Sequence, residues 1–493
     1  MELKDKRVLV VGLGKSGVAS ALFLKAHGAR VTVSDTKSGD ELRNEIPVLL
    51  DHGITVETGG HGDRTFHGQD LIVVSPGVPV DAPPLVQAKA QGVSVIGEIE
   101  LAAQFLTGPI VAITGSNGKT TTTTLAGEIM TAAGFPALVG GNIGTPAISL
   151  AERAQPETVI VLEVSSFQLE TIQTFRPKVA VVLNVTPDHL DRHRTFEAYT
   201  DAKARILENQ QTSDFSVLNA DDPTCVAMAA RTRAQVFWFS RQKEVQQGTW
   251  VQDGAIVFRG AQKEVKPAPS FAQDSVFIGP NERQTIMLVS EIPLKGAHNL
   301  ENVLAAACAG VLMGCAHEKI RQAVREFKAV EHRLEFVASI GGVDYYNDSK
   351  ATNVDATIKA LESFPANIHL ILGGKDKGSD YTALNDLLRQ RVKRVYTIGA
   401  AAAKIESQIA SFSGTHGGIH GGTQDKSGAV DVVSANTLDH ALRKAHAAAQ
   451  PGDVVLLAPA CASFDQFKNY EHRGQVFKDL VRTLAAEDKA GAS

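Results

Sequence analysis

The sequence has few cysteines and no long apolar run, and these absences narrow the class of protein. Its four cysteines, Cys225, Cys308, Cys315 and Cys461, form neither a zinc-ligand spacing nor a disulfide framework. No apolar stretch is long enough to cross a bilayer, and residues 1–7 lack the apolar core of a secretion signal. The net charge of −5 gives no indication of binding to nucleic acid or to an anionic membrane. We therefore expect a cytoplasmic enzyme, and 493 residues suit about three domains.

A glycine turn between an apolar strand and a helix is the strongest functional signal. The turn reads Gly115-Ser116-Asn117-Gly118-Lys119-Thr120, it follows the apolar residues 110–113, and a run of threonines from Thr121 continues it. Backbone N–H groups at the positive end of a helix bind phosphate, a lysine there reaches the terminal phosphates, and a threonine hydroxyl can ligate Mg²⁺. In an ordinary P-loop four residues separate the two glycines, which would place the first glycine at position 113, where this chain has Ile113. The spacing here is therefore shorter than usual. The turn predicts use of a nucleoside triphosphate; the alternative is a structural turn with an exposed lysine.

The first segment, residues 1–107, reads as a Rossmann-like domain. Gly12-Leu13-Gly14-Lys15-Ser16-Gly17 follows the strand 7–11, and the next strand, 30–34, ends at Asp35. Taken alone this is the dinucleotide fingerprint, with an acidic residue placed to meet a ribose. The alternative is a related domain that binds another nucleotide, or none. A further strand, 71–74, ends in a tight turn with Ser75 and Gly77, where a parallel sheet presents its ligand crevice.

The second segment, residues 108–329, alternates strands and helices around the P-loop, which indicates a parallel sheet. Glu163 ends a β-rich run beside the P-loop strand, where a carboxylate can hold Mg²⁺; it could also be an exposed strand-end residue. His189 follows the next strand and could complete a second metal site or be inert. Residues 250–259 predict a hairpin around Asp253-Gly254, and residues 266–281 a loop. Lys203 lies in a helical stretch, 196–209, where composition alone predicts an exposed lysine.

The third segment, residues 330–493, has a strand set of its own, with polar or glycine turns after the apolar strands, and again indicates a Rossmann-like sheet. His332-Arg333 opens it. An arginine at a domain junction can contact a γ-phosphate or form an interdomain salt bridge. Residues 411–427, rich in Gly, Ser and His, predict a mobile surface loop, although His416 and His420 could ligate a metal. We assign no role to the stretches 240–290 and 411–428, which we interpret as surface insertions.

Together these motifs resemble the Mur ligase family of ATP-dependent amide-forming ligases, over nearly the whole chain. The resemblance rests on the short-spaced P-loop, which is the form this family uses, and on Glu163, the turn 184–189, His298-Asn299, His332-Arg333 and Asp348-Ser349-Lys350. Three longer strings, 97–101, 165–170 and 460–467, are similar to family members that add D-glutamate. The family implies an α/β fold of three domains: a Rossmann-like domain, a central P-loop ATPase domain with a parallel sheet, and a Rossmann-like C-terminal domain.

The family also implies the reaction. ATP phosphorylates the terminal carboxylate of UDP-N-acetylmuramoyl-L-alanine, the amine of D-glutamate attacks the acyl phosphate, and a tetrahedral intermediate collapses to amide, ADP and phosphate. Two anions meet in the first step, so the site needs cations, and Mg²⁺, Lys119, Arg333 and Lys350 supply them. The resemblance implies two Mg²⁺ ions, the first held by Thr120 and Glu163 and the second by Glu163, His189 and a carbamylated Lys203. Carbamylation needs the neutral amine, which burial favours.

The remaining roles follow from the same resemblance. Its ATP contacts are the turn 115–121 with Asn299, Asn302, Arg333 and Asp348, and its D-glutamate contacts are Thr352, Lys377, Ser463 and Tyr470. The N-terminal fingerprint becomes a UDP site of Gly14, Lys15, Ser16, Asp35, Thr36, Ser75 and Gly77, and Asn142 contacts the substrate acid. The partners implied are these small molecules, with no nucleic acid and no membrane insertion, and the family implies a monomer.

Three other interpretations are open from the sequence. Folylpolyglutamate synthase shares the P-loop and the activation chemistry, but lacks a Rossmann first domain with a GxGxxG turn. An NAD-dependent dehydrogenase with an accessory nucleotide domain would bind its dinucleotide at the Gly12–Gly17 turn. A non-catalytic nucleotide-binding regulator would need no amino-acid site.

Overall fold

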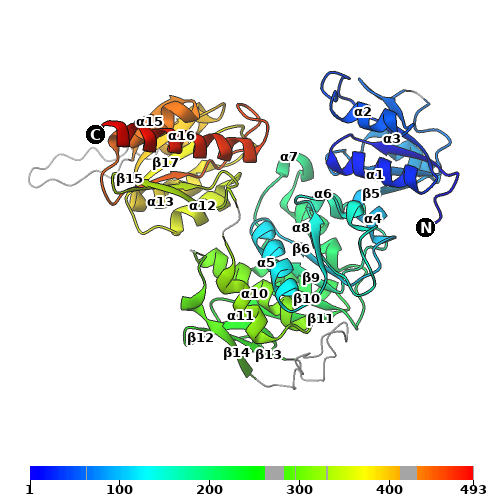
Figure 1. Ribbon diagram of the computed structural model, residues 1–493, viewed down its shortest axis with the longest axis horizontal. Helices are drawn as coiled ribbons and strands as arrows, with labels where there is room; N and C mark the ends of the chain where they lie inside the picture. The colour runs from blue at the N-terminus through cyan, green and yellow to red at the C-terminus, as the bar shows by residue number, and fades with distance from the viewer. Residues whose placement is uncertain (63, 261–282, 295, 329–330, 411–429, 492–493) are drawn as a thin grey trace, which may run out of the picture. The chain divides into compact units, whose positions relative to one another are not determined.

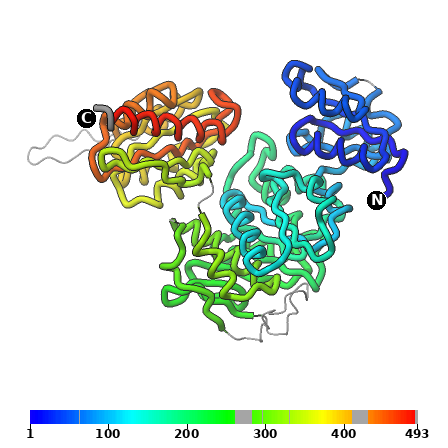
Figure 2. Tube along the Cα trace, in the orientation of Figure 1, coloured from blue at the N-terminus to red at the C-terminus, as the bar shows by residue number. Residues whose placement is uncertain are grey.

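The computed structural model describes residues 1–62, 64–260, 283–294, 296–328, 331–410 and 430–491. The strands form three sheets, drawn as arrows in Figure 1. Figure 2 traces the path of the chain in the same orientation. Contacts divide the chain into two compact units. The first contains Met1–Val185, Phe196–Pro293 and Leu300–Phe327, and the second contains Thr186–Thr195, Leu294–Asn299 and Lys328–Ser493. The predicted loops 266–281 and 411–427, with His416 and His420, lie outside the described residues, and the domain boundaries stay predictions.

The first sheet is wholly parallel, as the Rossmann-like pattern predicts. Its order is β3 (Thr55–Glu57), β2 (Arg30–Ser34), β1 (Arg7–Val11), β4 (Leu71–Val74) and β5 (Ser94–Gly97). Its helices are α1 (Lys15–Ala26), α2 (Glu45–Asp51) and α3 (Pro83–Ala90). The turn from β1 to α1 needs its glycines, because a Cβ on Gly17 would lie 1.9 Å from the Gly12 carbonyl oxygen.

The second sheet has β6 (Ile110–Thr114) between β8 (Val159–Glu163) and β9 (Val179–Val182). Beyond β8 lies β7 (Ala137–Gly141). Beyond β9 lie β10 (Phe215–Asn219), β11 (Gln235–Ser240), β12 (Gly248–Gln252), β13 (Ala255–Arg259) and β14 (Arg283–Leu288). The strands are parallel except for β12, β13 and β14, whose mutual pairing is antiparallel. The predicted hairpin is confirmed as β12 and β13, and its turn residues Asp253 and Gly254 both have positive φ angles, +51° and +75°.

The α-helices that follow α5 (Lys119–Ala132) in this part of the chain are mostly short. They are α6 (Ser166–Leu169), α7 (Leu190–His193), α8 (Phe196–Ala204), α9 (Pro223–Met228), α10 (Ala297–Leu312) and α11 (His317–Glu326). Short 3₁₀ turns include η1 (Ala147–Leu150) and η2 (Arg205–Leu207). The predicted helix 196–209 is therefore α8 followed by η2.

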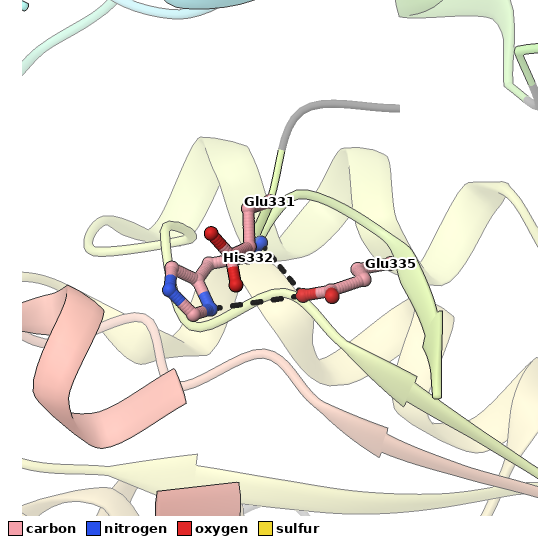
Figure 3. Close-up of side chains that lie close together, drawn as sticks. All are labelled: Glu331, His332 and Glu335. Carbon is pink, nitrogen blue, oxygen red and sulfur yellow. Dashed lines mark hydrogen bonds and ion pairs between the residues drawn. The ribbon is translucent and has the colours of Figure 1, made fainter. Parts of the chain in front are cut away.

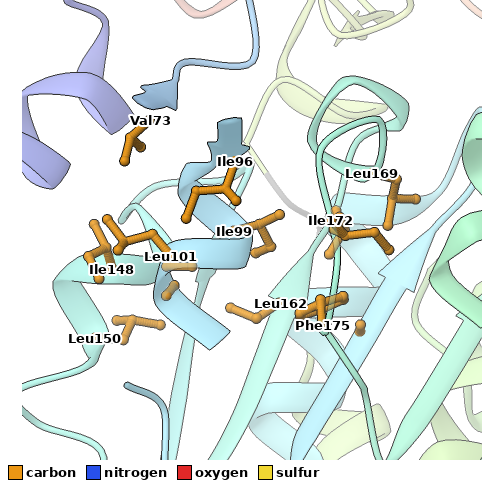
Figure 4. Close-up of a cluster of buried hydrophobic side chains, with 14 of the residues drawn as sticks. Val73, Ile96, Ile99, Leu101, Ile148, Leu150, Leu162, Leu169, Ile172 and Phe175 are labelled. Carbon is orange, nitrogen blue, oxygen red and sulfur yellow. The ribbon is translucent and has the colours of Figure 1, made fainter. Parts of the chain in front are cut away.

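A short connector helix, α4 (Glu98–Ala103), follows the last strand of the first sheet. It packs against η1 and α6, which connect strands of the second sheet. Its Ile99 and Leu101 belong to one buried cluster with Ile148, Leu162 and Phe175 (Figure 4). Each of these five side chains has no exposed surface. Burying an aliphatic side chain of this size stabilises a fold by about 1.5–3 kcal/mol, so the cluster fixes α4 firmly.

The third sheet lies in the second unit. Its order is β15 (Glu335–Ile340), β16 (Val343–Asn347), β20 (Val454–Leu457), β17 (Ile368–Gly373), β18 (Val392–Ile398) and β19 (Asp431–Asn436). All pairs are parallel except β15 with β16. Its helices are α12 (Val354–Glu362), α13 (Asn385–Arg391), α14 (Ala402–Ala410), α15 (Leu438–Ala448) and α16 (Tyr470–Gly491). The α/β class and the sheet in each of the three predicted segments are confirmed.

None of the helices in the described part of the chain combines the length and apolarity that a membrane crossing requires.

Candidate functional site

The P-loop turn after β6 is held by the residue that follows the neighbouring strand, β9. The Ser116 backbone N–H donates to the Asn184 carbonyl oxygen at 2.9 Å, and the Asn117 N–H donates to the Asn184 side-chain oxygen at 2.8 Å. Asn184 Nδ2 donates to the Asn117 carbonyl oxygen at 3.1 Å. Lys119 Nζ donates to the Gly115 carbonyl oxygen at 2.8 Å, so its ammonium group lies over the turn. The predicted phosphate-binding residues therefore form one fixed turn at the N-terminus of α5, which suits an anion.

Glu163 brings two other predicted residues together beside this turn. Thr120 Oγ1 donates to Glu163 Oε2 at 2.7 Å, and Asn142 Nδ2 donates to Glu163 Oε1 at 2.9 Å. The pairing of β6 with β8 places Glu163 opposite Ile113, and the pairing of β7 with β8 places it opposite Gly141, just before Asn142. Mg²⁺ prefers such hydroxyl and carboxylate oxygens, so Thr120 and Glu163 fit the implied cation.

Lys203 is buried, with 1% of its surface exposed, which corrects the expectation of an exposed helix lysine drawn from composition. Its Nζ donates to the Gly115 carbonyl oxygen at 2.8 Å and lies 4.6 Å from the centre of the Tyr199 ring. The Tyr199 hydroxyl lies 3.0 Å from Ser116 Oγ. Helix α8 thus contacts the P-loop through two side chains, which places Lys203 beside the predicted phosphate-binding turn. The sequence held no sign of the contact between Tyr199 and Ser116, because these two residues lie on separate elements.

Helix α10 also reaches the P-loop. A Cβ on Gly118 would lie 2.2 Å from Asn302 Oδ1, so this position needs glycine for space as well as for its φ of +85°. Asn302 therefore lies at the predicted ATP site. Asn299, one turn earlier on the helix, belongs to the second unit.

In the first sheet, the predicted UDP residues lie at the carboxyl ends of β1, β2 and β4. Asp35, which is 8% exposed, accepts the Leu13 N–H at 2.6 Å and the Lys37 N–H at 2.8 Å. Ser75 Oγ donates to the Gly12 carbonyl oxygen at 2.8 Å. These bonds fasten the three strand ends together into the crevice that parallel sheets use for ligands. The other predicted UDP residues lie in the same turns: Gly14, Lys15 and Ser16 after β1, Thr36 after β2, and Gly77 after β4.

In the second unit, polar residues gather after β16 and at the start of α16. Arg333 Nη1 lies 3.7 Å from Asp348 Oδ1, and burial raises the Asp348 pKa to about 6 although Arg333 partly offsets the shift. Lys350 Nζ donates to the Tyr470 hydroxyl at 3.3 Å. Lys350, predicted to act in catalysis, thus contacts Tyr470, predicted to bind D-glutamate, and lies two residues after Asp348, predicted to bind ATP.

The segment 186–195 contacts the same unit through Asp188. Asn353 Nδ2 donates to Asp188 Oδ2 at 2.9 Å, and Lys377 Nζ lies 3.8 Å from Asp188 Oδ1. His189 follows with a left-handed φ of +53°. Because Glu163 and Lys203 belong to the first unit, the metal site they were predicted to share with His189 stays a prediction.

Arg473 is a buried residue that the sequence interpretation missed. Its guanidinium has no exposed surface; Nε donates to Ser349 Oγ at 3.0 Å, and Nη2 donates to the carbonyl oxygens of Ser349 and Cys461 at 2.9 and 3.1 Å. Burial lowers the Arg473 pKa to about 10. Arg473 ties the loop of Lys350 to the loop of Ser463, which is 2% exposed. A lone arginine on an amphipathic helix gives no sequence signal of such a role.

Glu331, His332 and Glu335 form the group in the described part of the chain whose ligand atoms lie close enough to hold a metal (Figure 3). Lys478 Nζ donates to both carboxylates, at 3.1 Å to Glu335 Oε1. Asn347 Nδ2 lies 2.9 Å from His332 Nδ1. The amino group of Lys478 pairs with both carboxylates and offsets part of their charge, so we interpret the group as a structural network.

The fold and the site define a P-loop nucleotide-binding protein built on three α/β sheets. Three family models match consecutive parts of the chain: the Mur ligase MurD-like N-terminal domain at residues 6–97, the Mur ligase middle domain at 113–310, and the Mur ligase glutamate ligase domain at 332–461. The chain belongs to the Mur ligase family.

Curated relatives match over the whole length. The UDP-N-acetylmuramoylalanine–D-glutamate ligase of Koribacter versatilis is 60% identical over 99% of this chain and 100% of its own. The ligase of the same name from Acidobacterium capsulatum is 56% identical over 100% of both chains.

Solved structures show the same fold. UDP-N-acetylmuramate-alanine ligase MurC from Thermotoga maritima has a TM-score of 0.58 at 17% identity, over 97% of this chain and 99% of its own. MurF from Acinetobacter baumannii has a TM-score of 0.57 at 15% identity, over 96% and 93%.

Proposed function

We propose that this chain is an ATP-dependent ligase that joins D-glutamate to UDP-N-acetylmuramoyl-L-alanine in peptidoglycan synthesis. One observation carries the proposal: the P-loop, Glu163 and Asn142 form a single hydrogen-bonded site beside β6. The relatives that bear this activity in their names match the chain from end to end. A carboxylate is a poor electrophile, so ATP first converts it to an acyl phosphate, and the amine of D-glutamate then displaces the phosphate.

The P-loop residues bind and orient the triphosphate in this scheme. Backbone N–H groups of the turn and the Lys119 ammonium receive the phosphate oxygens, as the helix N-terminus favours. Asn142 donates to the acceptor carboxylate of the UDP substrate. Mg²⁺, held by Thr120 and Glu163, offsets the charge of the two anions that meet in the first step.

We further propose that Lys203 is carbamylated and, with Glu163 and His189, holds a second Mg²⁺. Its burial supports this, because a buried amine is more often neutral, and only the neutral amine forms a carbamate. The carbamate would replace a cation by an anion, which is what a metal ligand must be.

The third domain supplies the amino-acid site in this proposal. The two carboxylates of D-glutamate need a basic residue and hydroxyl donors, and Lys377, Thr352, Ser463 and Tyr470 provide them. Arg333, Asp348 and Asn299 contact ATP, and Lys350 stabilises the transferred charge. We expect the enzyme to act in the cytoplasm, as a monomer.

The deciding experiment is phosphate release with ATP, UDP-N-acetylmuramoyl-L-alanine and a panel of amino acids. We expect turnover with D-glutamate and little with L-alanine, diaminopimelate or L-lysine. Preference for one of these would overturn the substrate assignment. A change in absorbance at 340 nm with NAD and candidate alcohols would instead favour a dehydrogenase, and activity on a folate in place of the UDP substrate would favour folylpolyglutamate synthase.

A further inference from the structure

The connector helix α4 carries two buried glutamates that the proposed reaction does not use. Glu98 and Glu100 are 1% and 2% exposed. Glu100 is fully occupied: it accepts hydrogen bonds of 2.6 to 3.0 Å from the backbone N–H groups of Gln173, Thr174 and Phe175 and from the Thr174 hydroxyl. Glu98 lies two residues before Glu100, with Ile99 between them, and has different partners.

Glu98 holds the start of η1. Its Oε1 accepts the backbone N–H of Ile148 at 2.7 Å. Ile148 has no exposed surface, so water cannot replace Glu98 as the partner of this N–H group. Burial raises the Glu98 pKa to about 7, and the N–H groups of Ile148 and Ala147 partly offset the shift. A buried N–H group without an acceptor is costly, so η1 depends on Glu98 for its position.

η1 directly follows the loop that carries Asn142. The loop is closed by the Gly141 N–H, which donates to the Thr145 carbonyl oxygen at 2.8 Å, and Pro146 then leads into η1. At its entry, the Asn142 N–H donates to the Glu163 carbonyl oxygen at 2.8 Å. Glu163 therefore fixes one end of this loop, and Glu98 fixes the other.

The same glutamate borders the predicted substrate crevice of the first sheet. Ser75, Glu98 and Gln168 line one small cavity, and Glu98 Oε2 has no hydrogen-bond partner among the described residues. Gly97 allows this close approach, because a Cβ there would lie 2.1 Å from Thr171 Oγ1. Glu98 thus lies between the strand end that bears Ser75 and the loop that bears Asn142.

We propose that Glu98 is a positioning residue, which holds Asn142 in register with the first-sheet crevice so that one UDP substrate contacts both. This inference rests on the proposed function. The feature that matters is the hydrogen-bond acceptor offered to Ile148, which a glutamine also provides.

The test compares two variants of similar size in the full-length enzyme. Glu98→Gln keeps the acceptor, and we expect it to retain kcat/KM for UDP-N-acetylmuramoyl-L-alanine within about threefold. Glu98→Met keeps the volume without the acceptor, and we expect that kcat/KM to fall about tenfold or more, because small misplacements of binding groups are costly. KM for ATP and for D-glutamate should change less than about twofold in both, which a general loss of folding would not produce.

Glu100→Gln is the matched control, since it changes the same residue type on the same helix without touching the Asn142 loop. We expect it to lower thermal stability while KM for the UDP substrate stays within about twofold. Calorimetric titration of the UDP substrate separates the two proposals: a wild-type enzyme that does not bind it contradicts the proposed function. Equal binding and turnover by wild type and Glu98→Met would overturn the role of Glu98. If the methionine variant does not fold, a folded Glu98→Gln enzyme with a tenfold loss would overturn it alone.

Discussion

Thr120 and Glu163 lie 43 residues apart in sequence, one in the helix that follows β6 and the other in the neighbouring strand, and share a hydrogen bond of 2.7 Å. The bond joins the first residues of α5 to the end of β8. These are the two residues predicted to hold the first Mg²⁺, and the bond brings their oxygens within contact distance of one another.

Replacing Glu163 by glutamine should remove the charge and keep the size. We expect kcat to fall about 100-fold or more, because the site stabilises charge as it develops in the transition state. The measurement is phosphate release over a range of Mg²⁺ concentrations. Thr131→Val, a change at an exposed residue in the last turn of α5, is the control and should stay near wild type. A rate for Glu163→Gln within threefold of wild type would contradict the metal assignment.

Lys203 should not tolerate replacement by another cation. Lys203→Ala and Lys203→Arg are both expected to abolish turnover, since neither can form a carbamate. Added short carboxylic acids should restore part of the activity of the alanine variant, and mass spectrometry of the wild type should show a bound CO₂ on this residue. Lys178→Arg, a change at a half-buried lysine that directly precedes β9, is the control. Wild-type rates with Lys203→Arg would refute carbamylation.

Lys377 and Lys375 provide a matched pair in one loop. Lys377→Ala should raise KM for D-glutamate about tenfold or more and leave KM for ATP nearly unchanged, because a charged hydrogen bond contributes about 1.5–3 kcal/mol. Lys375 is exposed, and Lys375→Ala should alter neither constant. Initial rates measured over a range of D-glutamate concentrations give the KM of each of the two variants. Equal effects of the two substitutions would show that the loop's net charge matters and that Lys377 makes no specific contact.

The raised pKa of Glu98 makes a prediction about stability. In the unfolded chain this carboxyl ionises near its ordinary pKa of 4.5, whereas in the folded chain it does so only at about 7. Stability is therefore lost as pH rises from about 4.5 to 7, by roughly 3 kcal/mol at most. Glu98→Gln has no such ionisable group. The difference between its melting temperature and that of the wild type should therefore increase in its favour from pH 5 to pH 8. Parallel curves for the two proteins across this range would contradict the shift.

Local patterns were sufficient to predict much of this architecture. Apolar runs followed by glycine or polar turns predicted the strands and their class, because a parallel strand is buried on both faces and must be apolar along its length. The hairpin at Asp253-Gly254 followed from turn chemistry in the same way. The α/β class and the presence of a sheet in each of the three segments were within reach of such rules.

The surroundings of individual side chains were decided by tertiary structure alone. Lys203 reads as an exposed helix residue, yet it is buried against the P-loop, because what surrounds a helix face depends on segments distant in sequence. Arg473 and Glu98 likewise gain their partners from other loops, and a lone charged residue in the sequence carries no sign of them.

The sequence by itself determined the glycine turn at residues 115–120, since six consecutive residues between an apolar strand and a helix start are enough to predict an anion site. Only the tertiary structure decided what stands around it. Glu163, Asn142, Lys203 and Asn302 come from four separate elements, and the pairing of β6 with its neighbours and the packing of α8 and α10 bring them to one place. Hydrogen bonds and burial act across space, and these contacts join residues far apart in the chain.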